Sequence, residues 1–213
     1  TEENVLDNEL VKRDLLATAI TMTSQGIPFF QAGDEFLRSK YGDHNSYKSP
    51  DAINQINWEN KVQFKPVFDY YKGLIELRKS HPAFRMSTRA AVESNLVVNK
   101  SADNIIVFEL KDYANGDSWN NIVVVYNANN STEAVTLPEA ADWNVVVNDK
   151  VAGNDVLETL QNTNTVNVAP LSIMVLYDEA KTETQIPTSI EVNSDVIGIE
   201  VGGFKFLQPV VRD

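Results

Sequence analysis

The chain has 213 residues, of which 43% are apolar and 23% charged, and its formal net charge is −12. This is the balance of a globular protein of one large or two small domains, and its acidity makes nucleic acid a poor candidate partner. Because the chain has no cysteine, disulfides, thiolate metal sites and cysteine nucleophiles are excluded.

A first helix is expected over residues 8–25, NELVKRDLLATAITMTSQ. Asn8 is suited to the N-cap, and Gly26 and Pro28 follow the last turn. The residues of its apolar face recur at helical spacing, and they are Leu10, Val11, Leu15, Ala19 and Met22. The acidic opening TEENVLDNEL is not a signal peptide and has no Met before it, so we expect the chain to be part of a longer protein.

A short buried strand is predicted directly after this helix. In GIPFFQAG the residues Ile27, Phe29 and Phe30 form a continuous apolar run, which is typical of a parallel strand covered on both faces. Helix, tight turn and buried strand together indicate a βα-repeat fold. Asp34 and Glu35 then stand where barrel enzymes place active-site residues. Adjacent side chains point apart, so we expect this pair to bond backbone N–H groups or Arg38.

The next segment, residues 42–58, reads GDHNSYKSPDAINQINW and is called the polar loop below. Long polar loops between buried elements are usually functional. Amides and carboxylates can bond sugar hydroxyls, and an aromatic ring such as Trp58 can cover the apolar face of a sugar. The alternative is a solvated loop that is stabilised by its own Asx turns, with Trp58 buried as packing. Composition leaves both open.

A second helix is predicted within residues 65–84, KPVFDYYKGLIELRKSHPAF, with Pro66 in its first turn and Pro82 ending it. Its apolar face is expected to contain Phe68, Tyr71, Leu74, Ile75 and Leu77. At the helix end, His81 is expected to compensate the helix dipole rather than to take part in catalysis.

From about residue 87 the pattern changes to short β runs separated by turn-forming stretches, which indicates an antiparallel β-sandwich. The runs are NLVVN, NIIVFEL, NIVVVYNA, EAVTLP, WNVVVND and TVNVAPLSIMVLYD. TETQIPTSI, residues 182–190, is expected to be a linker. The segment after it has strand alternation but too few residues for a core of its own.

The stretch QGIPFFQAGDEFLRSKYGDHNSYKSPDAINQINW resembles the last barrel segment of type I pullulanases, which are debranching members of the α-amylase superfamily. GIPFFQAGDEF is similar to the eighth-strand motif of that superfamily, and FDYYKGLIELRKSHPAFRM resembles its eighth barrel helix. The resemblance covers residues 1–180. It implies that residues 1–85 end a (β/α)8 catalytic barrel, that 86–180 form a C-terminal β-sandwich, and that 181–213 are a linker and the start of an immunoglobulin-like module.

This resemblance implies a retaining glycoside hydrolase that cleaves α-1,6 branch links in pullulan, starch or glycogen. It also implies that the catalytic carboxylates lie on earlier barrel strands, so the chain alone is expected to be inactive. The substrate-binding residues it suggests are Asp43, Asn45, Ser46, Tyr47, Asp51 and Asn54. No catalytic residue, metal ligand or cofactor is assigned to this chain, and calcium use by the whole enzyme stays open.

The expected partner is an α-glucan, with neither nucleic acid nor membrane insertion. An incomplete barrel would leave Ile27, Phe29, Phe30 and the apolar faces of both helices partly exposed, so self-association through this face is also expected. A secreted or cell-surface location in a bacterium is implied, with the cytoplasm as the alternative. The rival functions are another α-amylase-superfamily enzyme, such as an amylase or isoamylase, and a non-catalytic carbohydrate-binding or structural module.

Overall fold

The computed structural model of the chain describes residues 2–178, 191–193, 196–201 and 204–209. It contains two compact units, residues 1–179 and residues 180–213. The second unit has three antiparallel strands, β7 (Glu191–Asn193), β8 (Val196–Val201) and β9 (Phe204–Pro209). The predicted linker at 182–190 lies outside the described residues. Among the residues that are described, no helix has the length and apolarity that a membrane crossing requires.

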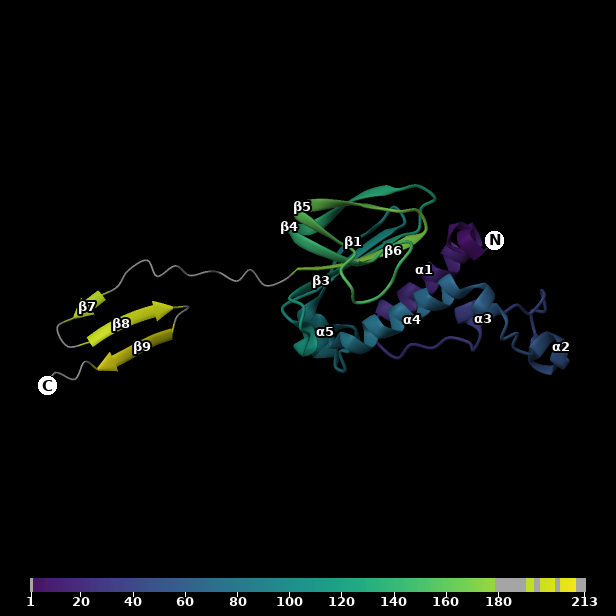
Figure 1. Cartoon of the computed structure of the whole chain (residues 1–213), viewed down its shortest axis with the longest axis horizontal. Coiled ribbons are helices and arrows are strands. Elements are labelled where there is room, and N and C mark those ends of the chain that lie inside the picture. Colours follow the sequence, from purple (N-terminus) through teal and green to yellow (C-terminus); the bar gives the residue numbers. More distant parts are fainter. Residues whose placement is uncertain (1, 179–190, 194–195, 202–203, 210–213) are drawn as a thin grey trace. The chain divides into compact units, whose positions relative to one another are not determined.

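Two long helices, α1 (Glu9–Thr23) and α4 (Lys65–Ser80), lie together against one sheet in the first unit (Figure 1). Both were predicted, and their caps agree with the sequence. Asn8 accepts hydrogen bonds from the N–H groups of Leu10 and Val11, and Pro66 lies in the first turn of α4. The shorter helices are η1 (Glu2–Asp7), η2 (Asp34–Phe36), η3 (Ser46–Lys48), α2 (Asp51–Asn54), α3 (Asn60–Gln63), η4 (Pro82–Arg85), α5 (Arg89–Asn95) and η5 (Ala114–Gly116).

The sheet of the first unit has six antiparallel strands in the order β1-β2-β3-β6-β4-β5. They are β1 (Leu96–Ala102), β2 (Ile105–Leu110), β3 (Asn121–Asn127), β4 (Glu133–Val147), β5 (Glu158–Val168) and β6 (Ser172–Asp178). The runs EAVTLP and WNVVVND, predicted as separate strands, join in β4. The pairing of β4 with β5 shifts register between Thr136 and Ala141, where Pro138 has no N–H to donate.

The sheet has an apolar core on each face, because its central strands are buried on both sides. In β3, Ile122 and Val124 pack toward the helices, whereas Val123 and Val125 belong to the second core. The first half of β4 and part of β5 cover that second core, since Val135, Leu137, Val166 and Val168 pack there around the fully buried Trp143. The sheet therefore folds over itself, which supports the predicted β-sandwich.

The expectation that both helices would leave their apolar faces partly exposed is wrong for most of the residues predicted there, although Phe68 and Ile75 are only half-buried. Ala19 of α1 and Leu74 and Leu77 of α4 have no solvent exposure, and they pack in one core with Val124 and Val175 of the sheet. The sheet thus buries the helix faces that, by the sequence interpretation, only a complete barrel would bury. Leu10, predicted to lie on the apolar face of α1, is instead exposed.

The strand predicted at residues 27–30 does not form in this structure. Ile27 is 98% exposed and Phe29 89% exposed. A strand needs partners for its backbone N–H and C=O groups, and no strand of the described residues pairs with this segment. Beside it lies a groove of about 720 Å³, which is lined by Met22, Ile27, Pro28, Phe30, Ile75, Met86 and several polar side chains. Self-association through this segment has no support in the structure and stays a prediction.

Candidate functional site

The polar loop is anchored by two basic side chains that precede it. The Arg38 guanidinium donates to the carbonyl oxygens of Ala32, at 2.9 Å, and of Asn54. The Lys40 Nζ donates to Asn54 Oδ1 at 2.7 Å. Gly33 has a φ of 100°, and a Cβ there would lie 2.7 Å from the Arg38 side chain. Glycine at position 33 therefore leaves room for the side chain that holds the loop.

Two of the predicted site residues hold the polar loop from within. Asn54 Nδ2 donates to the carbonyl oxygens of Ser46 and Ser49, both at 2.7 Å. The carboxylate of Asp43 accepts hydrogen bonds from the Ser49 hydroxyl and from the Asn45 N–H. These two hydrogen bonds lower the pKa of Asp43, so the carboxylate stays ionised in this role. Asp43 and Asn54 are thus engaged in shaping the loop.

The other predicted site residues present unoccupied polar groups. Within the described part of the chain, the side chains of Asn45, Ser46 and Asp51 form no hydrogen bond. Asp51 is exposed and begins α2. Tyr47 is also exposed, and the Lys48 ammonium lies 5.2 Å from its ring centroid. The loop therefore divides into residues that fix its shape and residues that are free to meet a ligand, a division that the sequence left open.

The adjacent carboxylates Asp34 and Glu35 cap backbone groups, as predicted. Asp34 Oδ2 accepts from the Gln31 N–H at 3.0 Å, and Glu35 Oε2 accepts from the Gly33 N–H at 2.8 Å. Both hydrogen bonds stabilise the turn into η2, so neither group is available as a facing catalytic carboxylate.

A polar cluster between α1 and α4 was missed from the sequence. The Tyr71 hydroxyl donates to Asp14 Oδ2 at 3.0 Å and accepts from the Thr18 hydroxyl at 2.7 Å. Partial burial raises the pKa of Asp14, so this carboxyl takes up a proton more readily than a free one. The helical spacing of Asp14 and Thr18 was the only available signal, and Tyr71 is far away in sequence.

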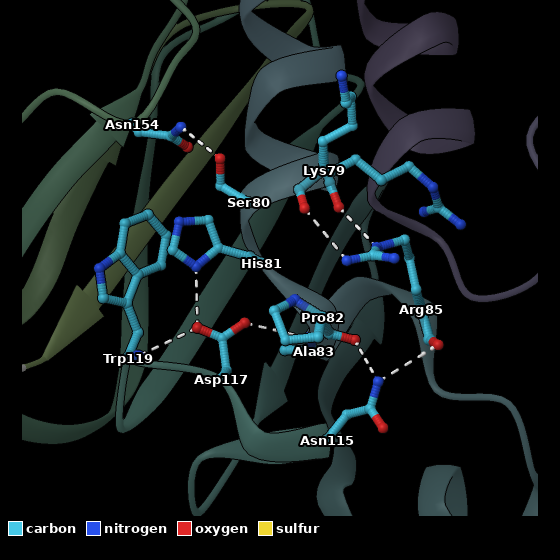
Figure 2. A network of polar contacts seen from close by, with 11 residues as sticks. Lys79, Ser80, His81, Pro82, Ala83, Arg85, Asn115, Asp117, Trp119 and Asn154 are labelled. Atoms are coloured by element: carbon cyan, nitrogen blue, oxygen red, sulfur yellow. Dashed lines mark hydrogen bonds and ion pairs between the residues drawn. The ribbon is translucent and has the colours of Figure 1, made fainter.

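A second buried network joins the end of α4 to the connection between β2 and β3 (Figure 2). His81 Nδ1 lies 2.8 Å from Asp117 Oδ1, and the same carboxylate accepts from the N–H groups of Ala83 and Trp119. The His81 ring stacks on Trp119 at 3.4 Å between centroids, and Trp119 stacks on Tyr177 at 4.0 Å. His81 is only 4% exposed.

This network is structural rather than catalytic. Its histidine and carboxylate are buried, and their hydrogen bonds go to each other and to the backbone. His81 does end α4, as expected, but its ring pairs with Asp117 instead of facing solvent as a simple dipole partner. Asn115 adds a hydrogen bond to the Pro82 carbonyl oxygen at 2.8 Å (Figure 2).

Acid is expected to weaken the first unit through Asp117. Burial raises the pKa of Asp117, but the hydrogen bonds from His81, Trp119 and Ala83 outweigh it and leave the pKa below its ordinary 3.8. A carboxyl with a lower pKa in the folded state stabilises the fold above its unfolded pKa and loses this contribution as pH falls through the folded value. Urea unfolding between about pH 5 and pH 2 should therefore show falling stability, and Asp117→Asn should flatten that fall. Equal slopes in both proteins would contradict this.

Comparison with known proteins matches this chain to pullulanases. Residues 92–151 match the family model described as "Pullulanase, all-beta domain". The chain is 33% identical over 171 residues to a pullulanase of Bacillus subtilis strain 168, a match that covers 80% of this chain and 23% of that protein. A pullulanase structure from Bacillus acidopullulyticus superposes with a TM-score of 0.75 at 43% identity, covering 81% of this chain and 21% of that one.

The type I pullulanase of B. subtilis strain 168, solved in complex with maltose, superposes with a TM-score of 0.73 at 33% identity over 80% of this chain and 24% of that one. Over 80–81% of its length, the chain is therefore similar to pullulanases, among them a type I pullulanase. It spans less than a quarter of the length of these pullulanases, and the match is consistent with their C-terminal part. The resemblance read from the loop motif is therefore confirmed, and so is the all-β character of residues 96–178.

Proposed function

We propose that the chain supplies one wall of the α-glucan-binding cleft of a retaining pullulanase that hydrolyses α-1,6 links in pullulan, starch or glycogen. The polar loop carries this proposal. Asp43 and Asn54 fix its backbone, and Asn45, Tyr47 and Asp51 offer unoccupied groups to solvent. Preorganised donors and acceptors of this kind are what a sugar with several hydroxyls requires. The maltose complex of a relative supports the ligand class.

We also propose that α1, residues 27–30 and α4 are the last helix, strand and helix of a (β/α)8 barrel. The exposure of Ile27 and Phe29 and the apolar groove beside them support this, since a barrel strand would gain pairing on both edges. Residues 1–85 would then belong to the barrel, 86–180 to the sandwich, and 181–213 to a linker and a further module. The core that helices and sheet share would join the first two parts rigidly.

In a retaining glycosidase one carboxylate attacks the anomeric carbon, and a second carboxylic acid protonates the leaving oxygen. The family resemblance places both outside the residues matched here, so the proposal gives this chain a role in positioning the substrate. The isolated chain should accordingly release no sugar from pullulan. A secreted or cell-surface location for the whole enzyme is part of the proposal, as is an α-glucan as its partner.

The proposal is tested by Asp51→Asn in the intact enzyme that contains this chain. The change keeps the shape of the side chain but removes a charge, and hydrogen bonds to charged groups contribute roughly 1.5–3 kcal/mol. We expect kcat/KM on pullulan to fall by about tenfold or more, because about 1.4 kcal/mol corresponds to tenfold. The melting temperature should not change, since Asp51 meets no partner among the described side chains.

Asp43→Asn is the matched control, because Asp43 holds the loop through Ser49 and Asn45. Stability and activity should fall together in that variant. An Asp51→Asn enzyme that folds normally and keeps its kcat/KM would remove Asp51 from the site. The products of the intact enzyme decide between the rival activities, because only cleavage of α-1,6 links turns pullulan into maltotriose.

A further inference from the structure

Trp58 is exposed in a way that the other two tryptophans are not. Trp143 is fully buried and Trp119 half-buried, whereas Trp58 is 66% exposed. Its ring packs against Phe36 of η2, which is 1% exposed, with 5.7 Å between centroids and 44° between ring planes. The indole therefore rests on a buried aromatic side chain while most of its surface stays in solvent.

The backbone around Trp58 is fixed on both sides. Asn57 Oδ1 accepts from the Glu59 N–H at 3.1 Å, and Asn57 Nδ2 donates to Asn60 Oδ1 at 3.1 Å. The Trp58 carbonyl oxygen accepts from the Lys61 N–H at 3.2 Å. The Lys61 ammonium in turn lies 4.4 Å from the ring centroid of Phe68 in α4. An aromatic ring held in this way loses little conformational freedom when a ligand packs on it.

Covering a large apolar side chain that is exposed to water gains roughly 1.5–3 kcal/mol, so an occupant that packs on the indole would gain binding free energy. A covering protein surface would be apolar, and it would approach a loop that also carries the free carboxylate of Asp51 and the free amide of Asn45. Desolvating unpaired polar groups is costly. A sugar ring has both an apolar face for the indole and hydroxyls for the polar groups, so its chemistry matches the whole loop.

We propose that Trp58 is a stacking platform for a glucosyl ring of the α-glucan, and that Phe36 is a positioning residue that packs against the indole and holds its orientation. The inference rests on the proposed function of the polar loop and adds to it the apolar half of the contact. Asp51 and its neighbours would bond the hydroxyls, and Trp58 would cover the C–H face of a ring.

The test uses the intact enzyme with Trp58→Ala, Trp58→Phe and Phe36→Leu. Trp58→Ala should raise KM for pullulan roughly five- to tenfold and leave kcat within about twofold, because stacking that is equally strong in the ground state and the transition state is uniform binding. Trp58→Phe should restore most of the affinity. Phe36→Leu should raise KM less, and it should add nothing in the Trp58→Ala background if Phe36 acts through the indole. A full additional effect in that background would overturn the role given to Phe36.

Acrylamide quenching separates a sugar platform from a buried packing residue. The difference in fluorescence between wild type and Trp58→Phe reports Trp58 alone. In the intact enzyme this signal should be quenched by acrylamide and then protected by maltotetraose. A signal that is already shielded without sugar would show that protein covers Trp58, and it would overturn the inference. Loss of activity in Asp51→Asn with unchanged kinetics in Trp58→Ala would overturn only the platform, whereas no effect in either variant would overturn the function of the loop as well.

Discussion

Replacing Asp117 by Ala should lower the free energy of unfolding by about 3–5 kcal/mol, the usual cost of removing one partner from a buried charged network. Three donors would lose their acceptor in the interior, namely His81 Nδ1 and the N–H groups of Ala83 and Trp119. The stack of His81, Trp119 and Tyr177 would lose the group that orients it. For a unit of this size, a loss of that magnitude corresponds to a melting temperature about 10 °C lower.

Urea and thermal unfolding of the purified chain would measure this effect. Asp155→Ala is the matched control, because Asp155 is exposed and no described side chain pairs with it. The control should change stability by no more than about 0.5 kcal/mol. If Asp117→Ala behaved like Asp155→Ala, the network would contribute nothing to the junction between helices and sheet.

Gly73→Ala should destabilise the chain by about 2 kcal/mol, although the same change inside most helices is favourable. Alanine normally gains about 1 kcal/mol over glycine in a helix interior. Gly73 lies where α4 passes the connection between β4 and β5, and a Cβ there would stand 1.9 Å from the carbonyl oxygen of Ala152. Backbone must move to relieve this clash, and overpacking of this kind costs about 3 kcal/mol.

Lys72→Ala is the control for Gly73→Ala, since its side chain is exposed on the same helix. It should alter stability by about 0.5 kcal/mol or less. A more stable Gly73→Ala protein would mean that α4 and the connection between β4 and β5 are farther apart than the structure has them. The result therefore tests how closely the helices approach the sheet.

Local periodicity was sufficient to find the two long helices and most of the strands. The spacing of Leu15, Ala19 and Met22 reflects one buried face, and such patterns are local. What covers that face is not local. The apolar run at Ile27, Phe29 and Phe30 has the composition of a buried strand, but composition does not supply a pairing partner. The first half of β5 was missed because ETLQNTN has almost no apolar alternation.

The candidate site was predictable as a set of residue types and not as a set of roles. Positions 43 and 51 are both aspartates of the polar loop, and only their surroundings distinguish their roles. The Ser49 hydroxyl donates a hydrogen bond to the Asp43 carboxylate, whereas no described side chain forms a hydrogen bond with Asp51. His81 and Asp117 are 36 residues apart in the sequence, so no local sequence motif around either residue could predict their pairing.

The position of β6 between β3 and β4 decides when the first unit can close during synthesis. The hairpins β1–β2–β3 and β4–β5 are local in the chain, and each can pair early. The inner edges of these groups, at β3 and β4, stay unpaired until residues 172–178 leave the ribosome, because β6 bonds to both β3 and β4. Until then α1, which is translated first, faces an unfinished sheet. Pairing of β6 therefore completes the sheet of the first unit. A chain that stops before β6 would expose the apolar edges at β3 and β4 together.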